Sequence, residues 1–325
     1  MKVLVTGAAG FIGSHLAERL LSLGHEVVGI DSLTDYYPRW IKRRNLEPLL
    51  QNPRFQYVPG DLTEINLSLA LQDTQWVFHH AAQAGVRASW GSSFETYAKA
   101  NMLATQRLLE ATKGTSIQKF VYASSSSIYG DAEAFPTAET AVPRPVSPYG
   151  VTKLAGEQLC YLYWRNYGVP TVALRYFTAY GPRQRPDMAF HLFGRALLEE
   201  QPIHIFGDGL QTRDFTYIDD VLTANMLAAQ SGSPGEVFNI GGGSRISLRE
   251  ALAHLEAATG RSALLHYEAM QKGDARHTAA DIQKAQRVLG YQPTVAIAEG
   301  LHREVAWLKE LLAAEAALPV DEKAR

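Results

Sequence analysis

Cysteine, long apolar runs and an excess of charge of either sign are scarce in this sequence of 325 residues. The single cysteine, Cys160, excludes an internal disulfide and a cysteine-rich metal site, and it is typical of a reducing compartment. Cys160 falls in a helical pattern and is expected in the core. No apolar stretch is long enough to span a membrane, and the first residues enter a strand pattern that leaves no room for a signal peptide. We therefore expect a cytoplasmic protein.

The charge and composition exclude further classes. A formal net charge of -2 gives no basic surface for nucleic acid. The one basic cluster, Lys42, Arg43 and Arg44, is interpreted as a solvated helix face. The ten histidines show no metal-ligand spacing, so no catalytic metal is expected. With 46% hydrophobic residues, the chain has the composition of a globular protein and is long enough for two lobes.

The most informative stretch that is present lies at the start, MKVLVTGAAGFIGSHLAERLLSLG. Residues 2–6 predict a strand, and apolar residues at a period of about 3.6 predict a helix that starts at Phe11. Gly24 is a candidate for its C-cap. The turn between strand and helix carries three glycines at three-residue spacing: Gly7, Gly10 and Gly13. Such a turn lets the backbone approach a pyrophosphate at a helix N-terminus, although an ordinary tight turn could look the same.

An acidic residue in the right place supports a dinucleotide site. A second predicted strand, residues 26–30, ends in Asp31. An acidic residue about 20 positions after the glycines is where the ribose hydroxyls of a dinucleotide are held. Asp31 would repel a 2′-phosphate, and no Arg or Lys follows it before Arg39. The sequence therefore favours NAD over NADP.

Strand and helix patterns alternate along the first half of the chain. Further strands are expected at 55–58, 76–79, 119–123 and 171–176, and the longer helices at 93–112 and 149–167. This alternation predicts an α/β fold with a doubly wound (Rossmann) parallel sheet.

The pattern loosens after Tyr176. Helices are expected at 188–200, 219–229, 248–259 and 297–317, and short strands at 203–206 and 236–240. We interpret residues 1–176 as the NAD-binding domain and 177–317 as a smaller α+β substrate lobe, with some exchange of strands and helices between the two. Residues 318–325 are expected to form a frayed tail.

The stretch SPYGVTKLAGE carries a second chemical pattern. Tyr149 and Lys153 stand four residues apart at a predicted helix start, so their side chains share a face. In a doubly wound fold, the ends of the strands line the ligand crevice, and the strand just upstream ends in four serines. Lys153 and a positively charged nicotinamide would lower the pKa of Tyr149 from about 10 and favour its phenolate. A tyrosine that merely packs on a lysine stem is the alternative.

On these residues the chain resembles the extended short-chain dehydrogenases/reductases of the nucleotide-sugar epimerase/dehydratase kind, over nearly its whole length. The segments that carry the resemblance are TGAAGFIG, HHAAQAGVRAS, YASSSSIYG, SPYGVTK, RYFTAYGPRQRPDMA, RDFTYIDDV and GDARHTAADIQKA. AAQAGVR and YGPRQRPDMA most resemble UDP-glucuronate 4-epimerases. The resemblance implies tightly held NAD, a UDP-sugar substrate, and reversible oxidation of the sugar at C4 with return of hydride to the opposite face.

The serine segment narrows the reaction. Relatives that dehydrate or decarboxylate carry an acidic residue where this chain has Ser127, preceded by Ser126. The resemblance assigns Tyr149 as the acid–base residue and Ser125 as its partner hydroxyl, with Ser126 kept as a candidate. The residues expected around the cofactor are Gly7, Gly10, Phe11, Ile12, Gly13, Asp31, Asp61, Leu62, Ala81, Ala82, Asn101, Tyr149, Lys153 and Tyr176.

The expected substrate residues fall into three groups. Arg87, Ser126, Ser127 and Thr178 are candidates to hold the sugar carboxylate away from the alignment that would release carbon dioxide. Arg213 and Arg276 are candidates for the pyrophosphate of UDP. Arg185 and Asp187 lie in a loop that is expected to reach the nucleotide.

Other interpretations stay open at this point. An epimerase of UDP-glucose or of its N-acetylated analogue would use the same chemistry. A net dehydrogenase or reductase would release its cofactor, and a non-catalytic NAD sensor would not need Tyr149 and Lys153. Relatives pair the helices at 93–112 and 149–167 into a four-helix bundle. A homodimer is therefore expected, and the helix at 149–167 carries aromatic residues for it: Tyr161, Tyr163, Trp164 and Tyr167.

Overall fold

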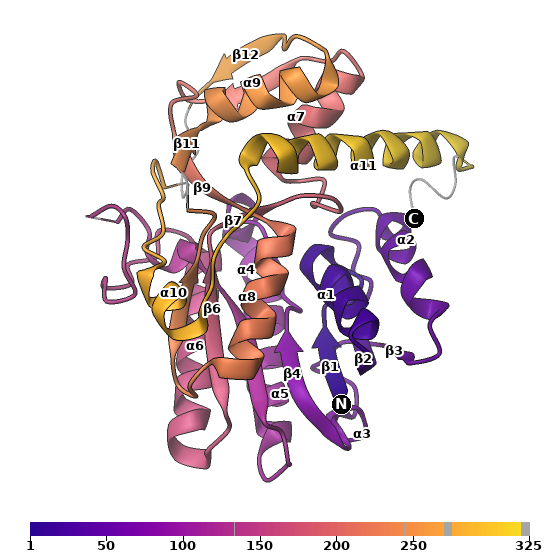
Figure 1. The fold of residues 1–325 in the computed structure, drawn as a ribbon, viewed down its shortest axis with the longest axis vertical. Helices are drawn as coiled ribbons and strands as arrows, with labels where there is room; N and C mark the ends of the chain where they lie inside the picture. Colours follow the sequence, from indigo (N-terminus) through magenta and orange to yellow (C-terminus); the bar gives the residue numbers. More distant parts are fainter. Residues whose placement is uncertain (133, 244, 270–274, 320–325) are drawn as a thin grey trace.

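A parallel sheet with helices on both faces forms the lower half of the molecule, and a smaller lobe sits above it (Figure 1). The computed structural model describes residues 1–132, 134–243, 245–269 and 275–319. The seven strands of the large sheet run in the order β10-β6-β5-β4-β1-β2-β3. Their bounds are β1 Lys2–Thr6, β2 Glu26–Asp31, β3 Phe55–Pro59, β4 Thr74–His79, β5 Lys119–Ser125, β6 Thr171–Tyr176 and β10 Val237–Ile240. The predicted doubly wound α/β fold is confirmed.

The central strands are apolar on both faces because helices cover both faces of the sheet. Val3, Leu4 and Val5 of β1 are fully buried, and β1 pairs in parallel with β2 on one side and β4 on the other. The order in which strands are added reverses between β1 and β4, because β2 and β3 extend the sheet on one side of β1 and β4, β5 and β6 extend it on the other. A doubly wound sheet opens a crevice at such a point.

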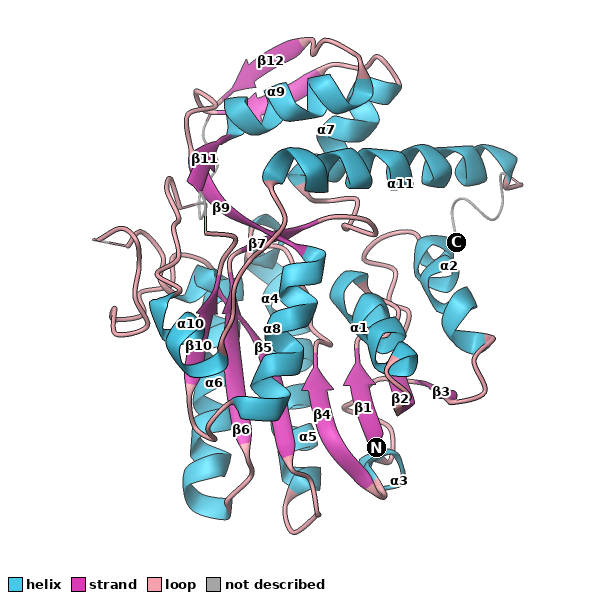
Figure 2. Cartoon of the chain, in the orientation of Figure 1, coloured by secondary structure: helices cyan, strands magenta, loops and turns pink. Residues whose placement is uncertain are grey.

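Two helix layers enclose the sheet (Figure 2). The first comprises α1 Phe11–Ser22, α2 Arg39–Leu50, α8 Ile218–Ser231 and α10 Gln283–Leu289. The second comprises α3 Leu67–Leu71, α4 Phe94–Tyr97, α5 Ala104–Thr112 and α6 Pro148–Tyr167. Pro148 and the side chain of Ser147, which accepts a hydrogen bond from the Gly150 N–H, fix the start of α6.

The helix predicted at 93–112 is not one regular helix. It consists of α4, a π-helical segment Ala98–Leu103, and α5, joined without a break. The extra residue per turn in a π-helical segment displaces side chains from the ordinary helical face, and such segments are frequent at functional sites. Asn101 lies in the middle of this one.

The upper lobe is built from segments that are distant in the sequence. It contains α7 Ala189–Leu198, α9 Leu248–Thr259 and α11 Ile297–Ala317, with β8 Ile203–Phe206 paired in parallel to β12 Leu265–Glu268. Three further strands, β7 Thr178–Tyr180, β9 Thr212–Tyr217 and β11 Arg245–Ser247, connect this lobe to the sheet edge. The sequence did not predict α3, β7, β9, β11, β12 or α10. Most of these are too short for their periodicity to stand out, and β9 carries the charged residues Arg213 and Asp214 in its middle.

The chain crosses between the two halves more than once after Tyr176. β10 hydrogen-bonds to β6 in the large sheet, and α8 packs on β5 and β6. The division into 1–176 and 177–317, with exchange of elements between the lobes, stays a prediction. Most of the tail expected at 318–325 lies outside the described residues.

Burial tests several expectations on individual residues. Cys160 is a buried core residue, as predicted. The prediction that Lys42 is solvated is wrong, because its side chain is buried next to Thr34, whereas Arg43 on the same helix is exposed. Tyr163 faces the core and bonds to Glu110, so it adds nothing to an exposed aromatic face. No helix in the described part of the chain is long and apolar enough to cross a membrane.

Candidate active site

A cavity of about 570 Å³ opens at the C-terminal ends of the large sheet's strands. It is lined by the glycine turn, by the segments that follow β2, β3 and β4, and by residues of β5, β6 and α6. Of the residues expected around a cofactor, all but Asn101 line it: Gly7, Gly10, Phe11, Ile12, Gly13, Asp31, Asp61, Leu62, Ala81, Ala82, Tyr149, Lys153 and Tyr176. A cavity of this size is in the range of small-molecule and cofactor sites.

The glycine turn forms a cradle that has no room for side chains. A Cβ on Gly7 would lie 2.8 Å from the Ala81 nitrogen, and Gly7 adopts a φ of +73°. A Cβ on Gly13 would lie 2.1 Å from the Gly7 oxygen. Helix α1 therefore starts directly against the cavity, and its N-cap, Gly10, offers no side chain to the first-turn N–H groups. This cradle fits the pyrophosphate of a dinucleotide.

Two carboxylates line the far end of the cavity. Asp31 accepts hydrogen bonds from the Ala9 N–H at 3.0 Å and the Leu33 N–H at 2.8 Å. Asp61 is held by Thr63 and lies 3.1 Å from the Lys99 ammonium. Asp31 is thus fixed where the ribose hydroxyls of a dinucleotide would lie.

Tyr149, Ser125 and Lys153 meet at the other end of the cavity. The Ser125 side chain lies close enough to the Tyr149 phenol to act on its pKa, and its hydroxyl oxygen accepts the Ser127 N–H at 3.1 Å. Lys153, one helical turn after Tyr149, is buried and lies 4.8 Å from the ring centroid of Tyr122. Of the two serine candidates, Ser125 contacts Tyr149.

The electrostatics around Tyr149 differ from the prediction. Burial raises the pKa of the Tyr149 phenol above its usual value, whereas the Arg185 guanidinium and then the Ser125 hydrogen bond act to lower it. Burial also lowers the pKa of Lys153 to about 8. The sequence predicted a phenol acidified by Lys153 and the nicotinamide. In the protein alone, loss of solvation outweighs the charges, and the cation that acts most on the phenol is Arg185.

A buried ion pair supports this region from behind. The Glu157 carboxylate on α6 accepts from Arg175 Nε at 3.0 Å and from the Ser124 hydroxyl at 2.8 Å. Arg175 also donates to the Tyr129 hydroxyl at 2.7 Å. Ser124 lines the cavity, so the network ties the serine segment, β6 and α6 into one rigid unit.

Asn101 supports the cavity without lining it. Its amide nitrogen donates to the Gln83 carbonyl at 3.0 Å and to the Thr152 hydroxyl at 2.9 Å, and its oxygen accepts the Gln83 N–H at 2.7 Å. The Thr152 hydroxyl donates to the Tyr149 carbonyl at 2.8 Å. Asn101 therefore links the loop after β4 to the first turn of α6, which carries Tyr149.

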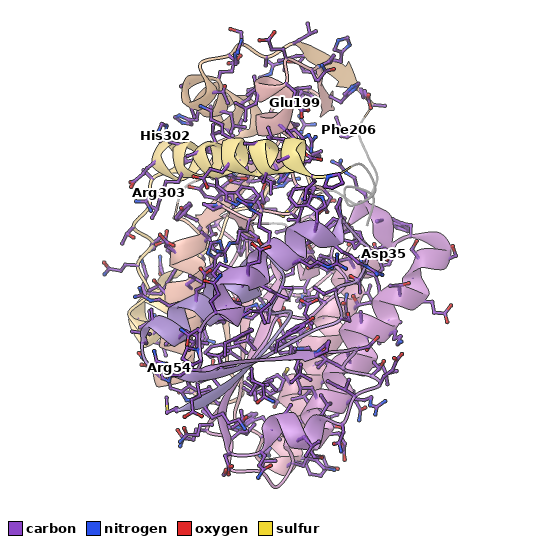
Figure 3. All side chains as sticks on the ribbon, turned by 90° about the vertical axis from the view of Figure 1, so that its right-hand side faces the viewer. Asp35, Arg54, Glu199, Phe206, His302 and Arg303 are labelled. Carbon is purple, nitrogen blue, oxygen red and sulfur yellow. The ribbon has the colours of Figure 1, made fainter. Side chains whose placement is uncertain are left out.

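The expected substrate residues form two groups. In the upper lobe, Arg213 donates to the Arg276 carbonyl at 3.1 Å, and the Arg276 guanidinium lies 2.7 Å from Asp208. Arg87 reaches the same lobe, where its guanidinium lies 4.5 Å from the centroid of Phe206, a residue labelled in Figure 3. Arg213, Arg276 and Arg87 thus surround the turn that follows β8.

The second group lies at the cofactor cavity. Arg185 lines the cavity and makes a bidentate pair with Asp187, at 2.9 and 3.0 Å. Asp187 also accepts the Tyr36 hydroxyl at 3.1 Å. Ser126 and Ser127 directly follow β5, and Thr178 begins β7 two residues after the end of β6, but none of the three lines the cavity.

The cavity has walls that the sequence did not indicate. Besides the expected residues, it is lined by Ser32, Thr34, Tyr36, Tyr37 and Lys42 on one side and Gln83, Ala84, Glu95, Thr96 and Lys99 on the other. Position directly after a strand would have suggested Ser32, whereas Gln83 lies four residues beyond the end of β4. Lys42 and Lys99 come from helices and become visible only in the folded chain. No group of three or more possible metal ligands occurs in the part of the chain that the structure describes.

This cavity at the strand ends, with its glycine cradle and tyrosine–lysine pair, defines a dinucleotide-dependent enzyme of the short-chain dehydrogenase/reductase type. The model of the NAD dependent epimerase/dehydratase family matches residues 3–241, and the chain belongs to that family.

Relatives of the chain include named epimerases. The chain is 47% identical to an uncharacterized UDP-glucose epimerase of Bacillus subtilis, over 97% of this chain and 100% of that one. It is 40% identical to the UDP-glucuronate 4-epimerase of Thermodesulfobacterium geofontis, over 94% and 96%. The crystal structure of UDP-glucuronic acid 4-epimerase from Bacillus cereus, in complex with UDP-glucuronic acid and NAD, matches with a TM-score of 0.93 at 47% identity, covering 96% of this chain and 100% of that one.

Proposed function

We propose that the protein is an NAD-dependent UDP-glucuronate 4-epimerase, which interconverts UDP-glucuronate and UDP-galacturonate. The observation that carries the proposal is the position of Tyr149 in the wall of a dinucleotide cavity, with Ser125 beside its phenol and serines rather than carboxylates at 126 and 127. A single acid–base group next to a hydride acceptor suits reversible oxidation of one alcohol. Carboxylates that would serve elimination are missing from the serine segment.

Different residues of the chain have different roles in this reaction. Tyr149 takes the proton of the sugar 4-hydroxyl and later returns it, while the Ser125 hydroxyl positions the reacting oxygen. Arg185 acts to lower the pKa of Tyr149 and so favours its phenolate form, while Lys153 lines the cavity one helical turn after Tyr149. When bound, NAD accepts the hydride from C4 and gives it back to the opposite face of the 4-keto sugar, so the cofactor is regenerated in each cycle. The glycine cradle, Asp31 and Asp61 hold the dinucleotide tightly enough for this.

UDP-glucuronate adds the hazard of decarboxylation, because its 4-keto form is a β-keto acid. Carbon dioxide would leave if the bond from C5 to the carboxylate aligned with the carbonyl π system. We assign Ser126, Ser127 and Thr178 to hold the carboxylate out of that alignment, since they follow β5 and β6, which carry the cavity residues Ser124 and Tyr176 at their ends. Arg87 is the fourth candidate, although its guanidinium lies on Phe206.

The UDP group is assigned to the upper lobe. Arg213 and Arg276 offer guanidinium groups for the pyrophosphate, and exchange of the Arg276–Asp208 ion pair for a phosphate would free a charged donor. Arg185 and Asp187 would contact the sugar side of the nucleotide from the cavity rim.

UDP-glucose is the second candidate substrate, because one relative at 47% identity is named a UDP-glucose epimerase. We would incubate the protein with UDP-glucuronate, UDP-glucose and UDP-N-acetylglucosamine separately and follow the products by proton NMR. UDP-galacturonate without a pentose or accumulated NADH is the expected result. A UDP-pentose would mean that decarboxylation occurs. Turnover of UDP-glucose but not of UDP-glucuronate would support the role of Tyr149 and would argue against the proposed carboxylate pocket. Loss of the cofactor during turnover would point to a net dehydrogenase.

We also propose a cytoplasmic homodimer. Exposed apolar side chains lie on two helical segments that pack on each other: Phe94 and Leu103, and Val151, Tyr161, Leu162 and Tyr167 on α6. Pairing of these faces across a two-fold axis would make a four-helix bundle and remove the apolar surface from water. A monomer in light scattering at micromolar concentration would argue against the dimer. The cytoplasmic location rests on the single buried cysteine.

A further inference from the structure

Lys42 is a buried cation at the ribose end of the cofactor cavity. Its side chain is only 6% exposed, and it lines the cavity together with Asp31 and Thr34. A lysine is rarely buried to this extent unless its charge is used, because removing an ammonium from water is costly.

The hydrogen bonds of Lys42 leave part of its ammonium for a ligand. Nζ donates to the Thr34 carbonyl at 2.7 Å and to the Thr34 hydroxyl at 2.9 Å. An ammonium has three N–H donors, so one remains. No ion pair among the described residues includes Lys42, and its other contact is the Tyr37 ring, whose centroid lies 4.7 Å away.

Asp31 provides the opposite charge at the same end of the cavity. Its two carboxylate oxygens accept the Ala9 and Leu33 N–H groups, so the carboxylate is fixed by the backbone and does not bond to Lys42. Burial lowers the pKa of Lys42, and among the nearby charges Asp31 acts on it most and raises it. Asp35 also raises this pKa, whereas Arg39 and Arg185 lower it. The cavity wall therefore presents an acceptor and a cationic donor side by side.

We propose that Lys42 is a cofactor-binding residue that donates to the adenine-ribose hydroxyls of NAD, and that Asp31 prevents this lysine from accepting the 2′-phosphate of NADP. A carboxylate accepts from a ribose hydroxyl and repels a phosphate, whereas an ammonium attracts both. Discrimination between NAD and NADP then depends on the pair rather than on Asp31 by itself. The inference uses only the dinucleotide part of the proposed function and needs no sugar substrate.

The test is a double-mutant cycle read by binding. Dissociation constants for NAD and NADP would be measured by calorimetry on cofactor-free protein for Asp31→Asn, Lys42→Gln and the double variant. Asp31→Asn should bind NADP about tenfold more tightly than the natural protein, as expected for one charge-assisted hydrogen bond to a phosphate. Adding Lys42→Gln should abolish that gain in NADP affinity, and Lys42→Gln alone should weaken the binding of NAD.

Arg43→Gln is the matched control, because Arg43 is the exposed neighbour of Lys42 on the same helix. Combined with Asp31→Asn, it should leave the gain for NADP unchanged. The proposal is overturned if Asp31→Asn gains nothing for NADP, or if the gain survives Lys42→Gln. The proposal is also overturned if Lys42→Gln weakens the binding of NAD and of NADP by the same factor, both alone and together with Asp31→Asn. A lysine that only anchors Thr34 would give that result. Thermal melting of the variants, with Lys42→Met included, shows whether a loss of cofactor binding comes from a failure to fold.

Discussion

Two buried carboxylates, one in each half of the molecule, are stabilised in different ways. Glu157, behind the cofactor cavity, is paired with Arg175 and also accepts from Ser124. Asp214, on β9 below the upper lobe, accepts only the N–H groups of Gly242 and Ala280 among the described residues. Burial raises the pKa of Asp214 to about 6. Glu157 thus has a guanidinium partner, whereas the backbone donors to Asp214 do not fully offset the effect of burial on its pKa.

The contrast extends to the two parts of the proposed active site. Buried side chains on long elements fix the geometry of the Tyr149 region. In contrast, Arg213, Arg276 and Asp208 lie on short segments. The side chains of Arg276 and Asp208 are about half exposed, and Arg213 is partly exposed. A rigid region can place a proton donor accurately, and a looser one can adapt to a large nucleotide sugar. Changes in the first should therefore affect the chemical step, and changes in the second should affect substrate binding.

The largest effect is expected from Tyr149→Phe. Removal of the acid–base hydroxyl should lower kcat by about 10²- to 10⁴-fold and leave NAD binding intact. Steady-state kinetics and the amount of bound cofactor would measure the two effects. Tyr161→Phe, on an exposed position of the same helix, is the control and should change neither. Retention of kcat in Tyr149→Phe would remove Tyr149 from the mechanism.

The next effect concerns stability in the cofactor half. Glu157→Gln leaves the Arg175 guanidinium buried without its carboxylate, and the free energy of unfolding should fall by about 3–5 kcal/mol. Urea denaturation would measure it. Glu299→Gln breaks the exposed pair with Arg303 on α11 and should cost less than about 1 kcal/mol. Equal losses in the two variants would contradict the distinction between buried and exposed pairs.

Asp214 should give a pH dependence of stability of the opposite kind to a paired carboxylate. Its pKa is 3.8 when unperturbed and about 6 in the folded protein, so the folded state holds this proton more tightly than the unfolded state. Its contribution is therefore complete below 3.8 and lost as the pH rises through 6. Relative to Asp214→Asn, the natural protein should lose up to about 3 kcal/mol across this window. Urea denaturation of the two proteins at several pH values would measure this loss. A difference in the free energy of unfolding that stays constant over the pH range would contradict the prediction.

The smallest effect is expected for substrate binding in the upper lobe. Arg213→Met should raise KM for the UDP-sugar about tenfold, the value of one charged hydrogen bond, and leave the dissociation constant of NAD unchanged. Arg261→Met, which removes an exposed arginine paired with Glu200, serves as the control. A change in NAD affinity in Arg213→Met would show that the two parts of the site are not separate.

Features that depend on nearby residues could be predicted from the sequence. The glycine turn, Asp31 at the end of β2, and the shared face of Tyr149 and Lys153 all follow from local spacing and periodicity, because strand and helix geometry alone fix those relations. The doubly wound sheet follows from the alternation of such elements.

Contacts between distant segments were decided only by the tertiary structure. Arg213 meets Arg276 because β9 and the segment at 276–278 run side by side, a register that no local pattern encodes. Lys42 looks like one of three surface cations in the sequence, yet the packing of α2 buries it at the ribose end of the cavity. The balance at Tyr149 likewise depends on Arg185 and on burial, and neither is visible before the chain folds, because solvation and charge are properties of the assembled site.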